Sequence, residues 1–300
     1  MDVVGLGNVV VDHLVVLPTM PSPDTKTRVL EDRLQVGGPV PTALVQLSRL
    51  GRRCRFLGSW GADALGPLIE ADLESEGVDL TGSQRRPGGR TGFAHVWVEA
   101  VGGARTIAYG RASEPILPEE LDDAHFAGVR ALHLDGYPQS AALEAAKRVR
   151  RQGGKVFLDT GSLKPGMEEL FAHTSVVSCP ARFVGELFGH DELERAADEL
   201  LAMGPEMVTI TCGPAGALLR TADERIHEPA FPVAATDTCG AGDVFCGGLI
   251  HGVLENWEPR QTIRFAMAAA AVKCTGLGNR EALPDRTQID ALLSAEPAGV

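Results

Sequence analysis

Short runs of apolar and β-branched residues alternate with longer helical patterns along most of this chain. The predicted strands lie at residues 3–12, 130–136, 155–161, 175–179 and 207–213. The predicted helices lie at residues 41–51, 65–78, 140–153, 193–204, 241–257 and 258–276. Several of these helices end in Gly, as helices commonly do. This alternation is typical of a mostly parallel sheet covered by helices on both faces.

Two segments interrupt the alternation and predict extra β structure. Residues 14–36 are rich in Pro and then extended, and residues 91–111 have the pattern of a hairpin that turns at Gly102 and Gly103. In the first arm of this hairpin, both the odd-numbered face and the even-numbered face are apolar, with Phe93, His95 and Trp97 on one and Ala94, Val96 and Val98 on the other. We expect a lid with one face over a ligand and the other against the core or a second subunit. An ordinary edge hairpin on its own domain is the alternative.

Composition limits the classes of function. A chain of 300 residues with 44% hydrophobic content can form one large α/β domain over residues 1–300. Its formal net charge of −12 disfavours nucleic acids and anionic membranes as partners. There is no apolar run of the roughly 20 residues that a membrane span needs, and the N-terminus has no basic region. The six cysteines form no C-x-x-C pair, which favours reduced thiols and a cytoplasmic location.

The stretch "DTCGAGDVF", residues 237–245, places two glycines and an aspartate where a helix is predicted to begin. The first N–H groups of a helix lack intrahelical partners and lie at its positive end, so they bind anions, and glycine lets a ligand approach them. A carboxylate in the same turn, Asp243, can accept the proton of a hydroxyl that attacks phosphorus. The alternative is a Gly-rich turn followed by an Asp in a favourable helix position.

Four further segments, together with residues 237–245, resemble the PfkB carbohydrate kinase family, the ribokinase-like sugar kinases. They are "VGGPVPTALVQLSRLG" at 36–51, "FLGSWGADALGPLIEADLESEGV" at 56–78, "VTITCGPAGALL" at 208–219 and "FAMAAAAVKCTGLGNREALPD" at 265–285. They occur in the family's order, and the resemblance runs from about Val3 to Leu293. It implies a ribokinase-like three-layer α/β/α fold with a small β-sheet lid at about 14–36 and 91–111. It also implies an ATP- and Mg²⁺-dependent sugar kinase.

The resemblance also implies roles for individual residues. Asp243 is the expected base, and the backbone amides of Gly240, Ala241 and Gly242 are expected to hold the phosphoryl group. The residues expected to bind or approach the sugar are Asp12 at the end of the first strand, Gly37, Gly38, Thr42 and, for an acidic sugar, Arg111. Those expected at ATP are Thr211, Gly213, Gly216 and Met267. Asp237 is expected to help hold a monovalent cation such as K⁺, as in some members.

The sequence departs from the family pattern at two places. Thr42 stands where the N-terminal signature commonly has an Asn that binds a sugar hydroxyl, which leaves the substrate open. Near "SVVSCPARFVGELFG" the family's N-x-x-E motif is not in register, and neither Ser178 nor Glu186 is assigned to replace it. The form "GGPVPTA" with "KCTGLG" resembles a ketohexose and sulfofructose kinase-like subgroup.

The sequence leaves several functions open. We expect a ketose-type sugar as substrate, and the alternatives are a 2-keto-3-deoxygluconate-type sugar acid, a nucleoside, or a sugar-binding regulator without activity. The lid has four basic residues, namely Lys26, Arg28, Arg105 and Arg111. If two or more of them lie at the pocket, an anionic sugar is the favoured substrate. Neither a dinucleotide fingerprint nor a P-loop occurs, and His13, His95, His125 and His133 have no recognisable metal spacing. A homodimer through the lid is a further expectation.

Overall fold

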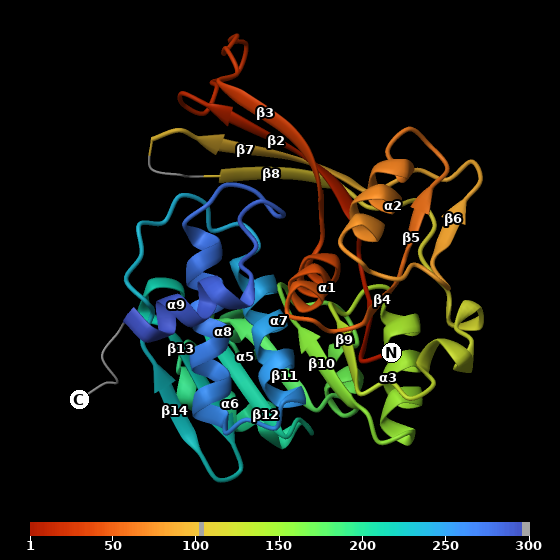
Figure 1. Cartoon of the computed structure of the whole chain (residues 1–300), viewed down its shortest axis with the longest axis vertical. Helices are drawn as coiled ribbons and strands as arrows, with labels where there is room; N and C mark the ends of the chain where they lie inside the picture. Colours follow the sequence, from red (N-terminus) through yellow and green to blue (C-terminus); the bar gives the residue numbers. More distant parts are fainter. Residues whose placement is uncertain (102–104, 296–300) are drawn as a thin grey trace.

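The central element of the fold is a mostly parallel sheet, as expected. The structure is a computed structural model that describes residues 1–101 and 105–295. Within these residues, eight strands form the sheet in the order β14-β13-β12-β11-β10-β9-β1-β4 (Figure 1). In the described sheet the β12–β13 and β13–β14 pairings are antiparallel and the others are parallel, so β13 alone runs opposite to the other strands. The strands are β1 (Val3–Leu6), β4 (Cys54–Leu57), β9 (Ala131–Leu134), β10 (Lys155–Asp159), β11 (Val176–Pro180), β12 (Met207–Thr211), β13 (Ala217–Thr221) and β14 (Arg225–Glu228).

Helices cover both faces of this sheet because its strands are apolar on both sides. Side chains of β1, β9 and β10 alternate between two hydrophobic clusters, so that Val3 belongs to one and Val4 to the other. The first cluster includes residues of α1 (Pro39–Arg49), α2 (Gly66–Ser75), α7 (Ala241–Leu254), α8 (Pro259–Cys274) and α9 (Arg286–Ala295). The second includes residues of α3 (Gln139–Arg151), α4 (Met167–Phe171), α5 (Ala181–Phe188) and α6 (Leu193–Ala202). The three-layer expectation is confirmed.

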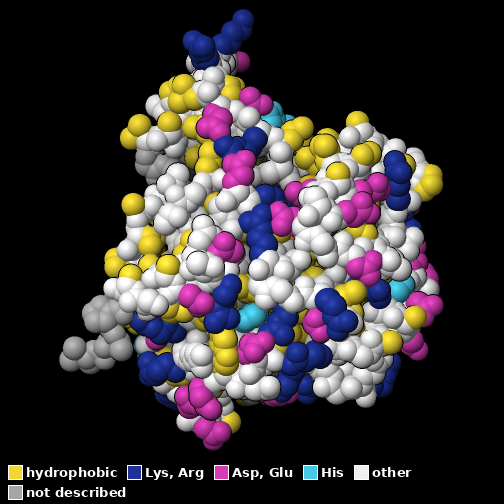
Figure 2. Space-filling model, viewed as in Figure 1, with side chains coloured by type: hydrophobic (Ala, Val, Ile, Leu, Met, Phe, Trp, Pro, Cys, Tyr) yellow, Lys and Arg dark blue, Asp and Glu magenta, His cyan; other side chains and the backbone are white. Residues whose placement is uncertain are grey.

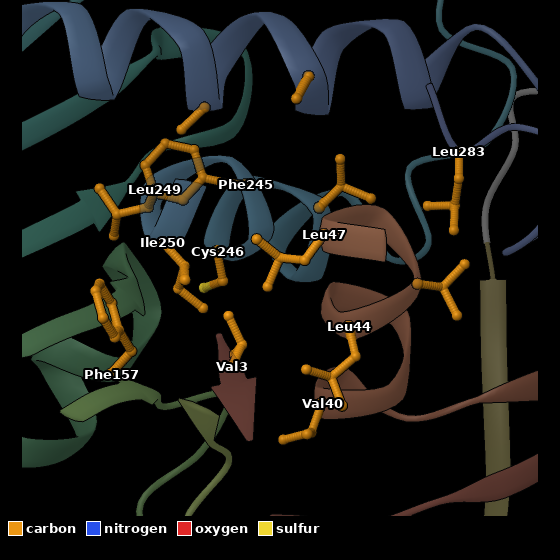
Figure 3. Close-up of a cluster of buried hydrophobic side chains, with 14 of the residues drawn as sticks. Val3, Val40, Leu44, Leu47, Phe157, Phe245, Cys246, Leu249, Ile250 and Leu283 are labelled. Carbon is orange, nitrogen blue, oxygen red and sulfur yellow. The ribbon is translucent and has the colours of Figure 1, made fainter. Parts of the chain in front are cut away.

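The first cluster fixes α7, the helix that begins in "GAGD". Figure 3 shows Phe245, Cys246, Leu249 and Ile250 of α7 among side chains of α1 and the sheet. Gly247 of α7 faces α1, where an added Cβ would lie 3.2 Å from the backbone oxygen of Ala43. The glycines of α7 therefore allow close helix packing, and this packing holds its N-terminus in place.

A second sheet forms the lid and lies over one end of the central sheet (Figure 1). In the described chain it has the strand order β3-β2-β7-β8. These strands are β3 (Glu31–Gly37), β2 (Val10–Leu17), β7 (Phe93–Glu99) and β8 (Arg105–Gly110), and a separate pair comprises β5 (Ser59–Gly61) and β6 (Gln84–Arg86). The expected turn at Gly102 and Gly103 lies outside the described residues.

The single strand predicted at residues 3–12 is two strands in the structure. β1 ends at Leu6, and the chain enters the lid as β2 at Val10. Gly7 lies where an added Cβ would be 2.8 Å from the Asp135 carboxylate, and the N–H of Asn8 donates to the same carboxylate at 2.8 Å. These contacts turn the chain out of the central sheet. Asp12 therefore lies on a lid strand rather than at the end of the first strand.

The two apolar faces of β7 have different surroundings. Ala94, Val96 and Val98 are buried and pack with Leu14 of β2. On the opposite face, His95 and Trp97 are exposed, with 38% of Trp97 accessible. Figure 2 shows hydrophobic side chains gathered over the lid end of the molecule and charges of both signs mixed over the opposite end of that face. None of the helices in the described part of the chain is both long and apolar enough to cross a membrane.

Candidate active site

A cavity of about 980 Å³ lies between the lid and the carboxyl ends of the central strands. Crevices at this edge of a parallel sheet are common ligand sites. Five neighbouring strands of the sheet end at the cavity, in the order β12, β11, β10, β9 and β1. The residues that line the cavity at or just after the ends of these strands lie in the same order. These residues are Thr211, Pro180, Asp159, Asp135 and Asn8. The cavity therefore runs from the predicted nucleotide residues toward β1 and the lid.

The N-terminus of α7 forms part of the cavity wall. Gly240, Ala241, Gly242 and Asp243 all line the cavity, which brings the predicted catalytic residues together. Gly240 precedes the helix with a φ of 78°, in the left-handed region that favours glycine. In the described structure no side chain caps this helix, and a Cβ added at Gly242 would meet nothing within 4 Å. The first turn of α7 is thus open to an anion, although the N–H of Ala241 already donates to the Thr238 carbonyl at 3.3 Å.

Asp243 has a carboxylate that is harder to ionise than an ordinary aspartate. Burial in the cavity wall, with the negative charge of Asp135 adding to it, raises the pKa of Asp243 to about 6. The positive charges of Lys273, Arg280 and Arg105 act in the opposite direction. A carboxylate with a pKa near 6 is ionised at neutral pH and is a stronger base than an ordinary aspartate.

Two further carboxylates of the cavity escaped the sequence analysis, Asp135 and Asp159. Asp159 ends β10, and burial together with the charges of Asp243 and Asp135 raises its pKa to about 7. Asp135 follows β9, and its carboxylate accepts N–H groups of Asn8 and Tyr137, each at 2.8 Å. The signal for both was an Asp near the end of a predicted strand, in "LHLDG" and "FLDTG".

Asp12, Gly37 and Gly38 adjoin this region but are not among the residues that line the cavity in the described chain. A Cβ at Gly37 would collide with the Asp12 carboxylate, and one at Gly38 would collide with the carbonyl oxygen of Asn8. Burial, followed by the charge of Asp243, raises the pKa of Asp12 to about 7. Gly37 therefore lets the end of β3 approach Asp12 closely, and Gly38 lets the start of α1 approach the backbone of Asn8.

Asn279 is a buried polar residue that the sequence analysis did not single out. Its Nδ2 donates to Asp12 Oδ2 at 3.4 Å, although 267 residues separate the two. A Cβ added at Gly240 would lie 3.0 Å from Asn279 Oδ1 and 3.7 Å from both Asp243 Oδ2 and Thr42 Cγ2. Among the described residues, neither Asn279 Oδ1 nor Thr42 Oγ1 has a hydrogen-bond partner. Two unsatisfied buried oxygens therefore lie beside the start of α7.

Two basic side chains of the lid line the cavity. Arg105 donates from Nη1 to Thr238 Oγ1 at 2.9 Å, and the Arg111 guanidinium lies 4.5 Å from the centre of the Tyr137 ring. Lys26 and Arg28 are exposed and are not among the lining residues in the described chain. Alternation along β8 explains this convergence, because Arg105, Ile107, Tyr109 and Arg111 are two residues apart and all line the cavity.

The four residues predicted at the nucleotide all line the cavity. Thr211 ends β12, and Gly213 and Gly216 form the turn to β13 with φ values of 56° and 98°. A Cβ at Gly216 would collide with the carbonyl oxygen of Glu228, so this turn requires glycine. Met267 of α8 lines the same cavity, as do the apolar residues Phe231, Ala270 and Ala271.

Asp237 does not line the cavity in the described chain, and its carboxylate already has partners. Oδ2 accepts the Lys273 ammonium and the N–H of Gly278, both at 3.0 Å, and Oδ1 accepts the N–H of Cys239 at 2.8 Å. These contacts do not suit the monovalent cation that the resemblance assigned to Asp237.

The region of the missing N-x-x-E motif carries basic groups at the cavity. The cavity is lined by the basic residues Lys164 and Arg182 and by Ser178. The Lys164 ammonium donates to the carbonyl oxygen of Asp135 at 2.6 Å. Glu186 accepts the N–H of Leu163 at 3.1 Å and is not among the lining residues in the described chain. Glu186 therefore does not replace the family's glutamate in this arrangement.

The family model described as "pfkB family carbohydrate kinase" matches residues 3–286, nearly the whole chain. This chain belongs to the pfkB family of carbohydrate kinases. As a member of this family it is a sugar kinase, a phosphotransferase that acts on a sugar hydroxyl. The pfkB resemblance expected from the five sequence segments is thus confirmed.

Known pfkB relatives and neighbours differ in their substrates. The chain is 27% identical to an ATP-dependent ribose-1-phosphate kinase of Halopiger xanaduensis, over 97% of this chain and 98% of the relative. It is also 27% identical to a ketohexokinase of Mus musculus, over 90% of this chain and 94% of the relative. Its structure matches a ribokinase of Thermotoga maritima with a TM-score of 0.86 and 27% identity, over 98% and 99% of the two chains. The ribokinase-like fold is therefore confirmed, and the comparisons leave the sugar open.

Proposed function

We propose that this kinase transfers the γ-phosphoryl group of ATP to a hydroxyl of an anionic sugar, with Asp243 as the base. The observation that carries the proposal is the position of Asp243 in the first turn of α7, one residue after the open backbone of Gly242. Base and anion-binding backbone thus share one wall of the cavity, where the acceptor hydroxyl and the phosphoryl group must meet.

ATP fits the end of the cavity at β12 and β13. The cavity volume of about 980 Å³ is at the upper end for small-molecule sites. Met267 and Phe231 provide apolar surface for a base, and the Gly213 to Gly216 turn lets phosphates approach backbone. The ATP dependence named for the Halopiger relative supports this nucleotide. Mg²⁺ usually takes one or two carboxylates and keeps water and phosphate ligands, and Asp159 is the cavity carboxylate that we assign to it.

The protein's own groups would perform the proton transfer and stabilise charge. Mg²⁺ would neutralise part of the phosphate charge when bound. Asp243 would accept the proton of the sugar hydroxyl as its oxygen attacks the γ-phosphorus, while the bond from that phosphorus to the β,γ-bridging oxygen breaks and ADP leaves. The N–H groups at the start of α7 would stabilise the negative charge on the transferred group. Asp12, Asn279 and Thr42 would hold other hydroxyls of the sugar, and the two unsatisfied oxygens of Asn279 and Thr42 support this assignment.

The basic residues at the cavity favour an anionic sugar over the ketose-type sugar expected first. Two of the four basic lid residues, Arg105 and Arg111, line the cavity, which meets the criterion set from the sequence. A guanidinium binds a carboxylate or a phosphate through two parallel hydrogen bonds, and this pairing is strong when partly shielded from water. The Halopiger relative, named for a sugar phosphate, supports the same class. The mouse ketohexokinase keeps a neutral ketose as the second candidate.

An ATP-consumption screen over ketoses, sugar acids, sugar phosphates and nucleosides tests the proposal. We expect the highest kcat/KM on an anionic sugar, a large loss of that activity in Arg111→Glu, and a KM that rises with added salt. A neutral ketose as best substrate, with KM unchanged by salt and by Arg111→Glu, would contradict the anionic class. Activity only on nucleosides, or ligand binding without turnover, would instead support a nucleoside kinase or a silent regulator.

We also infer a homodimer through the outer face of the lid, in a cytoplasmic enzyme. Trp97 is 38% exposed and Leu34 is 57% exposed on this face, and their strands both flank β2. Trp97→Glu would place a charge at the contact and should shift the protein toward monomer in light scattering. A wild-type protein that is already monomeric would contradict the dimer.

A further inference from the structure

A buried ion pair joins the loop that leads to α7 to the last turn of α8. Lys273, in the last turn of α8, has no exposed surface, and Asp237, three residues before Gly240, is 7% exposed. The Lys273 Nζ donates to the Asp237 carboxylate at 3.0 Å and to its backbone carbonyl at 2.9 Å. Burying an ammonium costs several kcal/mol, and a pair of this kind gives little net stability in return. A role beyond stability is therefore the better explanation for it.

The pair holds the segment just before the anion-binding turn. The Asp237 carboxylate also accepts the N–H of Cys239 at 2.8 Å and that of Gly278 at 3.0 Å. Burial alone would raise the pKa of Asp237, but the Cys239 N–H, the Lys273 charge and the Gly278 N–H together lower it. The carboxylate thus connects residues 237–239 to the end of α8 and to the loop that carries Asn279. The Lys273 charge also reaches Asp243, where it favours the ionised base.

A monovalent cation such as K⁺ does not fit this arrangement. K⁺ would need carboxylate and carbonyl oxygens, and both carboxylate oxygens and the carbonyl of Asp237 already accept N–H groups. A second positive charge beside the ammonium would also be repelled. The position that the resemblance assigns to a cation is therefore taken by a side chain of the protein.

We propose that Lys273 is a built-in cation, which positions the loop before α7 in place of a bound monovalent ion. The proposal rests on the kinase activity of the family. It assigns Lys273 a positioning role, because Lys273 contacts Asp237 and not the reacting groups. Consequently the enzyme should not depend on K⁺.

The first experiment uses the wild-type enzyme. At constant ionic strength, kcat should change by less than about twofold when choline chloride is replaced by KCl, NaCl or NH₄Cl. Thallium NMR, which reports binding of a K⁺ substitute without turnover, should show no saturable site. Saturable Tl⁺ binding that KCl displaces, or activation by K⁺ of several fold, would overturn the proposal. Binding of Tl⁺ or activation by K⁺ would count only against the role of Lys273. A lack of turnover in every salt would instead count against the kinase reaction.

The second experiment removes the ammonium. Lys273→Ala leaves space beside Asp237, so kcat in choline chloride should fall by about tenfold or more, and K⁺ or methylammonium should restore part of it. The variant should also gain Tl⁺ binding and thermal stabilisation by KCl. Lys147→Ala, which breaks the exposed pair with Glu169, is the matched control and should show neither effect. A folded Lys273→Ala variant with full activity in choline chloride would overturn the proposal, and if it does not fold, the wild-type titration still decides.

Discussion

Arg105 of the lid donates a hydrogen bond from Nη1 to Thr238 Oγ1 at 2.9 Å, and this bond connects β8 to the loop before α7. Arg105→Met should remove this hydrogen bond between the lid and the loop and a positive charge from the cavity, so KM for the anionic substrate should rise about tenfold. Steady-state kinetics with both substrates would measure this. Arg28→Met, at an exposed lid position outside the cavity, is the control and should leave KM unchanged. Equal KM values in wild type and Arg105→Met would contradict a role for this bond.

Asn279 should determine how well the sugar binds. Asn279→Ala removes both the contact with Asp12 and the free Oδ1, so KM for the sugar should rise by about tenfold while KM for ATP changes little. Thr42→Val, which keeps the shape and removes the unsatisfied Oγ1, should act in the same direction with a smaller effect. Calorimetry of sugar binding would measure both variants. A change in ATP affinity alone would assign Asn279 to the nucleotide instead.

The rate should depend on the ionisation of the carboxylates in the cavity. The pKa of Asp243 is raised to about 6, and the base must be ionised, so kcat/KM should fall as the pH drops through about 6. Asp135→Asn removes a negative charge that raises the pKa of Asp243, so the midpoint should move to lower pH. A pH–rate profile of both proteins measures this shift. A midpoint that stays in place would show that Asp135 does not act on the base.

His133 should make the fold sensitive to acid. Complete burial on β9 lowers its pKa from 6.5 to about 4, and this exceeds the opposing effect of the Phe157 backbone. Neutral His133 thus contributes stability that is complete above pH 6.5 and is lost as the pH falls toward 4, by at most about 3 kcal/mol. His133→Leu should reduce the loss of unfolding free energy between pH 7 and 4.5 in urea titrations. If the unfolding free energy of His133→Leu falls with pH as steeply as that of the wild type, His133 is not the cause of the acid sensitivity. His95→Gln, on the exposed lid face, is the control.

The sequence predicted the elements whose pattern is local. The alternating strands and helices and the start of α7 at "GAGD" followed from periodicity and from glycine at one helix end. The boundary between β1 and β2 was missed because residues 3–12 are apolar almost throughout. In such a run, the turn at Gly7 and Asn8 depends on contacts with Asp135, which lies far along the chain.

The sequence predicted those residues of the candidate site that lie in recognisable motifs. It did not predict the contacts that depend on how distant segments pack together. Asp243 and the nucleotide residues lie in recognisable motifs and line one cavity. Asn279 reaches Asp12 across 267 residues, and no local pattern marks such a pair. Lys273 belonged to a quoted motif, "KCTGLG", but only the three-dimensional structure shows that its ammonium is buried against Asp237.

The most direct test of the central claim is the turnover of Asp243→Asn. This substitution keeps the shape of the side chain and removes the proton acceptor, so kcat should fall by about 10² or more while calorimetry still detects ATP and sugar binding. Glu255→Gln, at the other end of α7, is the matched control and should retain wild-type kcat. A folded Asp243→Asn enzyme that binds both ligands and turns over at a near-normal rate would contradict the assignment of Asp243 as the base.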